Sequence, residues 1–140
     1  MKIIGTGSAH PKCCVTNTML EQFLETTDEW ITERTGIKER LVISSEKLEA
    51  MAVDAANNTA KDIDFIICSN VVNEYVTPVL SCIIQGKIGA TCPTLDINAA
   101  CAGFIFAMDM AEDKIRCKKA KNILIVCAEE PSRMVSWQNR

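Results

Sequence analysis

The segment Asp96-Ile97-Asn98-Ala99-Ala100-Cys101-Ala102-Gly103-Phe104 constrains the fold more than any other part of the chain. Its pattern is that of a short buried strand that passes directly into an apolar helix, with one cysteine at the junction. A thiol at a helix N-terminus faces unpaired backbone N–H groups and the positive end of the helix dipole, and both favour the nucleophilic thiolate. Position alone favours the alternative, a small buried core cysteine at the end of a strand.

The helix after this junction is unusual because residues 99–108 include no charged or strongly polar side chain. A helix that is apolar on all of its faces is normally buried on every side. One sheet layer can cover only one side of a helix. We therefore expect a second layer that this chain does not contain, or that another chain supplies.

Hydrophobic periodicity predicts an α/β fold with a largely parallel sheet, in the order β-α-β-α-β-α-β-α-β. The run at residues 64–70 is apolar between polar ends, which suits a strand buried on both faces. No linker or repeat divides the chain, so a single domain is expected. We expect strands at residues 2–7, 37–43, 64–70, 94–98 and 122–128, and helices near 18–24, 27–36, 48–56, 78–87 and from 100 onward.

Charge and composition exclude several classes of protein. The chain has 140 residues and a net charge of −3, without the basic patch that nucleic acid requires. No apolar run approaches the about 20 residues of a membrane span, and no signal peptide is evident. Eight cysteines without a C-x-x-C motif, beside the single histidine His10, predict reduced thiols and no metal site. We expect a cytoplasmic protein.

Four motifs, in order along residues 1–140, together resemble one known family. They are Lys2-Ile3-Ile4-Gly5-Thr6-Gly7-Ser8, Thr27-Asp28-Glu29-Trp30-Ile31, Arg34-Thr35-Gly36-Ile37-Lys38-Glu39-Arg40 and Ala99-Ala100-Cys101-Ala102-Gly103-Phe104. The chain resembles the N-terminal half of β-ketoacyl-acyl-carrier-protein synthase III. This resemblance implies a thiolase-like fold, in which the buried helix carries the nucleophile.

The resemblance also implies a reaction, the first condensation of type II fatty-acid synthesis. An acyl group would pass from acyl-CoA to Cys101, and malonyl-acyl-carrier protein would then lose carbon dioxide and attack the thioester. The backbone N–H of Cys101 would be one donor of the oxyanion hole. Acyl-CoA is a substrate in this scheme, no cofactor is expected, and the enzyme is expected to be a homodimer.

Four residues match the CoA site of the family. By this resemblance Trp30 stacks on the adenine, Thr26 bonds near that base, and Arg34 and Arg140 surround the nucleotide. Trp30 and Arg34 are four residues apart, so a helix places them on one face. Without the resemblance, a partly buried core anchor for Trp30 and a solvated helix face for Arg34 would be favoured.

Thr77 matches the residue that reaches into the partner subunit's acyl tunnel. A large aromatic residue there shortens the tunnel, so threonine predicts a longer or wider one.

The sequence also departs from the family. The family's catalytic histidine and asparagine come from its C-terminal half, and His10, which is expected at the surface, cannot replace them. This chain alone is therefore not expected to condense substrates. In addition, the segment from Met51 to Ile63 is shorter than the family pattern.

Two alternatives remain open. The chain could be a catalytically inactive thiolase-fold module, or part of a related polyketide- or quinolone-type synthase.

Overall fold

A computed structural model of the chain describes residues 1–57, 59, 62–139. The chain forms two compact units: Met1–Ala9 with Lys47–Glu129, and His10–Glu46 with Glu130–Arg140. No linker or repeat in the sequence marks the boundaries of these units. Contacts between distant segments make this division, and composition does not encode such contacts.

The first unit is built on a three-stranded parallel sheet in the order β4-β3-β5. Its strands are β3 (Phe65–Ser69), β4 (Thr94–Ile97) and β5 (Ile123–Cys127). The central strand β3 is covered on both faces, and three of its side chains are fully buried: Ile66, Ile67 and Cys68. The prediction of a strand buried on both faces is confirmed.

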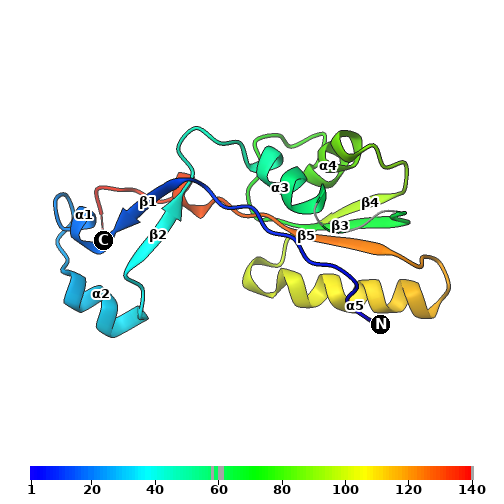
Figure 1. Ribbon diagram of the computed structural model, residues 1–140, viewed down its shortest axis with the longest axis horizontal. Coiled ribbons are helices and arrows are strands. Elements are labelled where there is room, and N and C mark those ends of the chain that lie inside the picture. The colour runs from blue at the N-terminus through cyan, green and yellow to red at the C-terminus, as the bar shows by residue number, and fades with distance from the viewer. Residues whose placement is uncertain (58, 60–61, 140) are drawn as a thin grey trace. The chain divides into compact units, whose positions relative to one another are not determined.

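Helices cover the two faces of this sheet (Figure 1). Helices α3 (Leu48–Asn57) and α4 (Leu80–Ile88) pack on one face, and α5 (Gly103–Arg116) packs on the other. Ile67 of β3 contacts Ala107 and Ala111 of α5, which are four residues apart and share one helix face. The parallel βαβ arrangement predicted for this part of the chain is confirmed.

Only one face of α5 is covered in this chain. Gly103, Ala107 and Ala111 are buried against the sheet. The opposite face carries Phe104 and Ile105, whose exposed fractions are 48% and 66%, and Phe106 is also exposed. The apolar helix start is thus covered by one layer and open on the other side, as expected for a chain that supplies a single layer.

The second unit contains an antiparallel pair of strands, β1 (Cys13–Thr16) and β2 (Glu39–Val42), joined through α1 (Asn17–Leu20) and α2 (Asp28–Thr35). The buried Asn17 side chain organises this connection. Its amide donates to Asp28 Oδ1 and to the Ile37 carbonyl, each at 2.7 Å, and its oxygen accepts from Arg40 Nη2 at 2.6 Å. One buried amide therefore joins α1, α2 and β2.

Two expectations for the first forty residues are wrong. Residues 2–7 form no strand; instead, a strand that the sequence did not indicate begins at Cys13. Gly5 packs against the chain after α3, where a Cβ would lie 2.5 Å from the Thr59 carbonyl oxygen. The first helix begins after Thr16, whose hydroxyl accepts from the Met19 N–H, and does not extend to residue 24.

No helix among the described residues is long and apolar enough to cross a bilayer.

Gly103 is the α5 residue that lies against Ser69, the last residue of β3. A Cβ on Gly103 would overlap the Ser69 hydroxyl and lie 3.0 Å from Ser69 Cβ. The hydroxyl can rotate away, but Ser69 Cβ is fixed to the backbone of β3 and cannot move without separating helix from strand.

We expect Gly103→Ala to lower the free energy of unfolding by about 1–3 kcal/mol, measured by urea denaturation of the folded chain. Gly86→Ala is the matched control, because Gly86 lies within α4 with no atom within 4 Å of its would-be Cβ. That control should be neutral or stabilise by up to about 1 kcal/mol. Equal effects of the two substitutions would contradict the close contact.

Candidate active site

The order of strands and helices indicates that a ligand site lies at the carboxyl ends of β3 and β4. Helix α4 follows β3 onto one face, and α5 follows β4 onto the opposite face. The two connections therefore diverge at the carboxyl ends of neighbouring parallel strands, where α/β sheets bind their ligands. Asn70 directly follows β3 at this edge, and Cys101 lies in the connection after β4.

Cys101 lies in a tight turn. A single 3₁₀ turn, Ala100–Ala102, precedes α5, and the N–H groups of Ala102 and Gly103 donate to the carbonyls of Ala99 and Ala100. Ala100 has a φ of 46°, a left-handed conformation that costs a non-glycine residue about 1–2 kcal/mol. The Cys101 residue is exposed. The predicted junction is confirmed, with a strained turn between strand and helix.

Cys68 has the environment that the core-cysteine alternative predicts. It is fully buried in β3, and burial raises the pKa of its thiol far above the ordinary 9.0, with the Asp96 carboxylate adding to the shift. A protonated, covered thiol is a poor nucleophile. The core interpretation therefore fits Cys68 and does not fit Cys101.

Asp96 is a structural residue of this edge that sequence analysis did not single out. Its carboxylate accepts the N–H groups of Leu80 at 3.1 Å and Ser81 at 2.9 Å. These are the first N–H groups of α4, whose N-cap residue Val79 makes no side-chain capping bond. Asp96 thus holds the start of α4 against β4. An acidic residue inside an apolar strand is the only sequence signal for this role.

Asn70 is a second residue that sequence analysis missed. It is 8% exposed, and its side-chain NH₂ group has no hydrogen-bond partner among the described residues. Its backbone N–H donates to the Ile97 carbonyl at 3.2 Å, which fixes the residue beside the end of β4. Leaving such a donor unpaired costs about 1–3 kcal/mol. The Asn70 side chain thus places a hydrogen-bond donor at the carboxyl end of the sheet, where the connection from β4 to Cys101 begins.

The residues matched to the CoA site lie on the second unit. Arg34 Cζ is 5.6 Å from the centroid of the Trp30 ring, so the predicted shared helix face is confirmed. Trp30 is 38% exposed, so part of its ring is open to solvent. The Thr27 hydroxyl caps the helix by accepting the Trp30 N–H at 3.1 Å. The Thr26 hydroxyl is buried and has no hydrogen-bond partner among the described residues.

The other predicted site residues are less informative. Thr77 is exposed in the first unit, before Pro78 and beside Val76, which is 95% exposed. His10 is exposed, as expected. Arg140 lies outside the described residues.

Several known proteins are similar to this chain in sequence and structure. A family model described as 3-oxoacyl-[acyl-carrier-protein (ACP)] synthase III matches residues 95–140. A β-ketoacyl-[acyl-carrier-protein] synthase III of Clostridium perfringens strain SM101 is 43% identical over 147 aligned positions, which span 99% of this chain and 45% of that protein. The crystal structure of 3-oxoacyl-[acyl-carrier-protein] synthase III from Aquifex aeolicus superposes with a TM-score of 0.96 at 41% identity, over 99% of this chain and 48% of that one.

In sequence and fold the chain is similar to β-ketoacyl-acyl-carrier-protein synthase III proteins. The resemblance drawn from the four motifs is therefore confirmed, as is the fold class. The chain spans about half the length of the synthase III relatives that it matches. The alignment with the Clostridium protein is longer than the chain itself, so this chain lacks residues that the relative has.

A second similar solved structure comes from a polyketide pathway. The priming β-ketosynthase of the R1128 polyketide biosynthetic pathway superposes with a TM-score of 0.94 at 30% identity, over 99% of this chain and 44% of that one. The synthase III fold thus also occurs in a polyketide enzyme.

We expect brief iodoacetamide treatment of the folded chain to label Cys101 and to spare Cys68. Because the thiolate fraction falls tenfold per pKa unit, Cys68 should react more than about tenfold more slowly. Peptide mass mapping measures both rates, and labelling in denaturant is the control that should equalise them. Equal rates in the folded chain would contradict the burial of Cys68.

Proposed function

We propose that this chain is the nucleophile-bearing N-terminal half of a β-ketoacyl-acyl-carrier-protein synthase III. The whole protein would be an acyltransferase that starts type II fatty-acid synthesis. The supporting observation is the exposed Cys101, held in a strained turn at the ligand-binding edge of a sheet whose fold superposes on a synthase III with a TM-score of 0.96.

The proposed reaction has two half-reactions. The Cys101 thiol gives up its proton, and its thiolate attacks the thioester carbonyl of acyl-CoA. The C–S bond to CoA then breaks, and CoA leaves as a thiolate that takes up one proton, which balances the proton lost from Cys101. Malonyl-acyl-carrier protein then loses carbon dioxide, and its carbanion attacks the acyl-Cys101 thioester. This attack releases the Cys101 thiolate and gives 3-oxoacyl-acyl-carrier protein. The Cys101 N–H would stabilise the oxyanion in both steps.

The side chains of the second unit would bind CoA. The exposed Trp30 ring, with the Arg34 guanidinium above it, offers a flat cationic surface for adenine and a charge for phosphate. The Thr26 hydroxyl would contact the nucleotide after a side-chain rotation, since its oxygen is covered. Arg140 is assigned to this site from the resemblance alone.

The remaining features of the proposal follow from the family resemblance. The enzyme would be a cytoplasmic homodimer, with acyl-CoA and malonyl-acyl-carrier protein as substrates and no further cofactor. The condensing step needs the histidine and asparagine of the other half. A priming synthase of a polyketide pathway is the second candidate, which the similarity to the R1128 enzyme favours.

We expect the full-length protein to gain the mass of one acetyl group on incubation with acetyl-CoA, and peptide mapping should place that group on Cys101. Cys101→Ala should abolish the gain. Cys117→Ala, which removes another exposed thiol, is the matched control and should leave it unchanged. No mass gain, or a group that maps elsewhere, would overturn the acyltransferase proposal in favour of an inactive module.

Thr77 yields a further prediction about the primer. If Thr77 faces the acyl tunnel, a full-length enzyme with threonine should accept acyl-CoA primers longer than acetyl-CoA. A series of acyl-CoA chain lengths measures this preference as kcat/KM. Thr77→Phe should shift the preference back toward acetyl-CoA, and a strict acetyl preference of the unchanged enzyme would contradict the idea.

A further inference from the structure

The turn that carries the candidate nucleophile is anchored at both of its ends by neighbouring residues. At its entry, the Asn70 N–H donates to the Ile97 carbonyl at 3.2 Å. At its exit, Gly103 lies so close to Ser69 that a Cβ on Gly103 would be 3.0 Å from Ser69 Cβ. Residues 98–102 therefore connect two points whose positions are both set by the end of β3.

Ser69 itself is firmly held in the sheet. It is 3% exposed, and its carbonyl accepts the Ala128 N–H at 3.1 Å. It is the register partner of Ile97 on one side and of Cys127 on the other. Because a residue paired on both sides cannot shift by itself, the approach of α5 must adapt to the Ser69 side chain.

Helix α5 depends on small residues where it meets the sheet. Its buried residues are Gly103, Ala107 and Ala111. Ala107 and Ala111 pack on Ile67 of β3, and Gly103 lies against Ser69 of the same strand. A larger side chain at position 69 would therefore displace the start of α5 while its later turns stay packed.

The turn is strained as well as anchored. Ala100 has a φ of 46°, which a non-glycine residue keeps only where its surroundings determine it. The internal bonds run from the Ala102 N–H to the Ala99 carbonyl and from the Gly103 N–H to the Ala100 carbonyl. Because a single 3₁₀ turn has poor hydrogen-bond geometry, the anchors at its two ends supply the rest of the constraint.

We propose that Ser69 is a positioning residue for Cys101: its small side chain sets how closely the start of α5 approaches β3, and thereby fixes the turn and the Cys101 N–H. This inference rests on the proposed function, because it takes Cys101 as the acylated residue and its N–H as an oxyanion donor. Ser69 touches no substrate in this scheme and acts through Gly103.

Two substitutions at Ser69 form a matched pair. Ser69→Ala removes the hydroxyl but keeps Cβ, so the close contact with Gly103 remains. Ser69→Val replaces the hydroxyl by a methyl group and adds a second branch at Cβ, in a site that is almost fully enclosed. Since valine is favoured in strands, an effect of this substitution would come from the contact with α5 and not from β3 itself.

The experiment measures the acetylation of Cys101 in the full-length protein at saturating acetyl-CoA. We expect the rate to fall about 10- to 100-fold in Ser69→Val, because a displacement of about 1 Å can cost a factor of about 100. In Ser69→Ala the rate should stay within about threefold, since the Cβ contact is kept. The dissociation constant for CoA should be unchanged in both variants, because the residues assigned to CoA belong to the second unit.

A second reaction of the same thiol distinguishes positioning from general damage. Alkylation of Cys101 by iodoacetamide forms no oxyanion, so it does not depend on the Cys101 N–H. Its rate should stay within about threefold in Ser69→Val, since it follows the thiolate fraction and exposure of the sulfur. The fully buried Cys68 monitors the fold, because its thiol should react quickly only if β3 is opened.

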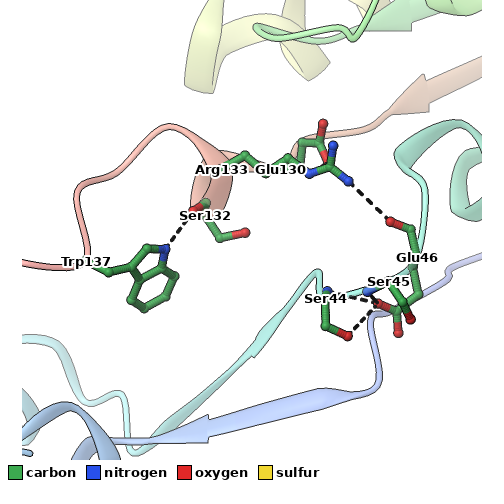
Figure 2. Close-up of polar contacts among 7 residues, drawn as sticks. All are labelled: Ser44, Ser45, Glu46, Glu130, Ser132, Arg133 and Trp137. Atoms are coloured by element: carbon green, nitrogen blue, oxygen red, sulfur yellow. Dashed lines mark hydrogen bonds and ion pairs between the residues drawn. The ribbon is translucent and has the colours of Figure 1, made fainter.

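Glu46→Gln is the control for a loss of stability away from the turn. The Glu46 carboxylate accepts the N–H groups of Ser44 at 3.1 Å and Ser45 at 3.2 Å (Figure 2). It also accepts the Lys12 N–H at 2.9 Å, and all of these residues belong to the second unit. This variant should weaken that unit and leave both reactions of Cys101 unchanged at saturating acetyl-CoA.

The outcomes separate this inference from the proposed function. If Ser69→Val is acetylated as fast as Ser69→Ala, or if acetylation and alkylation fall equally, the inference is overturned and the proposed function stands. If the unchanged protein is not acetylated on Cys101, the proposed function and the inference both fail. If rapid alkylation of Cys68 shows that Ser69→Val does not fold, Ser69→Thr, which keeps the hydroxyl and adds a methyl group, is judged by the same criteria.

Discussion

The double-sided burial of β3 is the constraint on which the first unit depends. A strand covered on both faces needs a helix on each, and the connections that supply those helices must leave the sheet in opposite directions. Helix α4 follows β3 onto one face, and α5 follows β4 onto the other. The divergence of these two connections places Asn70 and the Cys101 turn at the same edge. The location of the site is therefore a consequence of how the core is covered.

The elements that the sequence predicts well are those whose burial is local in the chain. The apolar runs at β3, β4 and β5 lie within one or two residues of their expected bounds. Residues 2–7 have a similar apolar character, but no strand forms there, and Gly5 packs against the backbone at Thr59. The partner of a segment fifty residues away cannot be read from periodicity. The Cys13–Thr16 strand was missed for the same reason, since only its pairing with β2 defines it.

The candidate site residues also differ in how far the sequence predicts them. Cys101 and the Trp30–Arg34 pair could be predicted, because a strand–helix junction and a four-residue spacing are local signals. Asp96 and Asn70 could not, since their roles depend on which helix starts and which strand ends lie beside them. Sequence thus indicates the reacting groups more readily than the groups that hold them.

The exposed face of α5 bears on the chemistry of Cys101. Phe104, Ile105 and Phe106 follow the cysteine within one helical turn, and each is about half exposed or more. Burying a side chain of this size stabilises a protein by about 1.5–3 kcal/mol. Burial of these three side chains under another protein layer would therefore be strongly favourable. Any layer that covers them also lies over the Cys101 turn and displaces water from it. An acyl thioester on Cys101 would then be shielded from hydrolysis, and donors such as the Cys101 N–H would act in a less polar medium, where they stabilise an oxyanion more strongly. On this argument, covering the apolar helix and protecting a thioester on Cys101 would be one structural event.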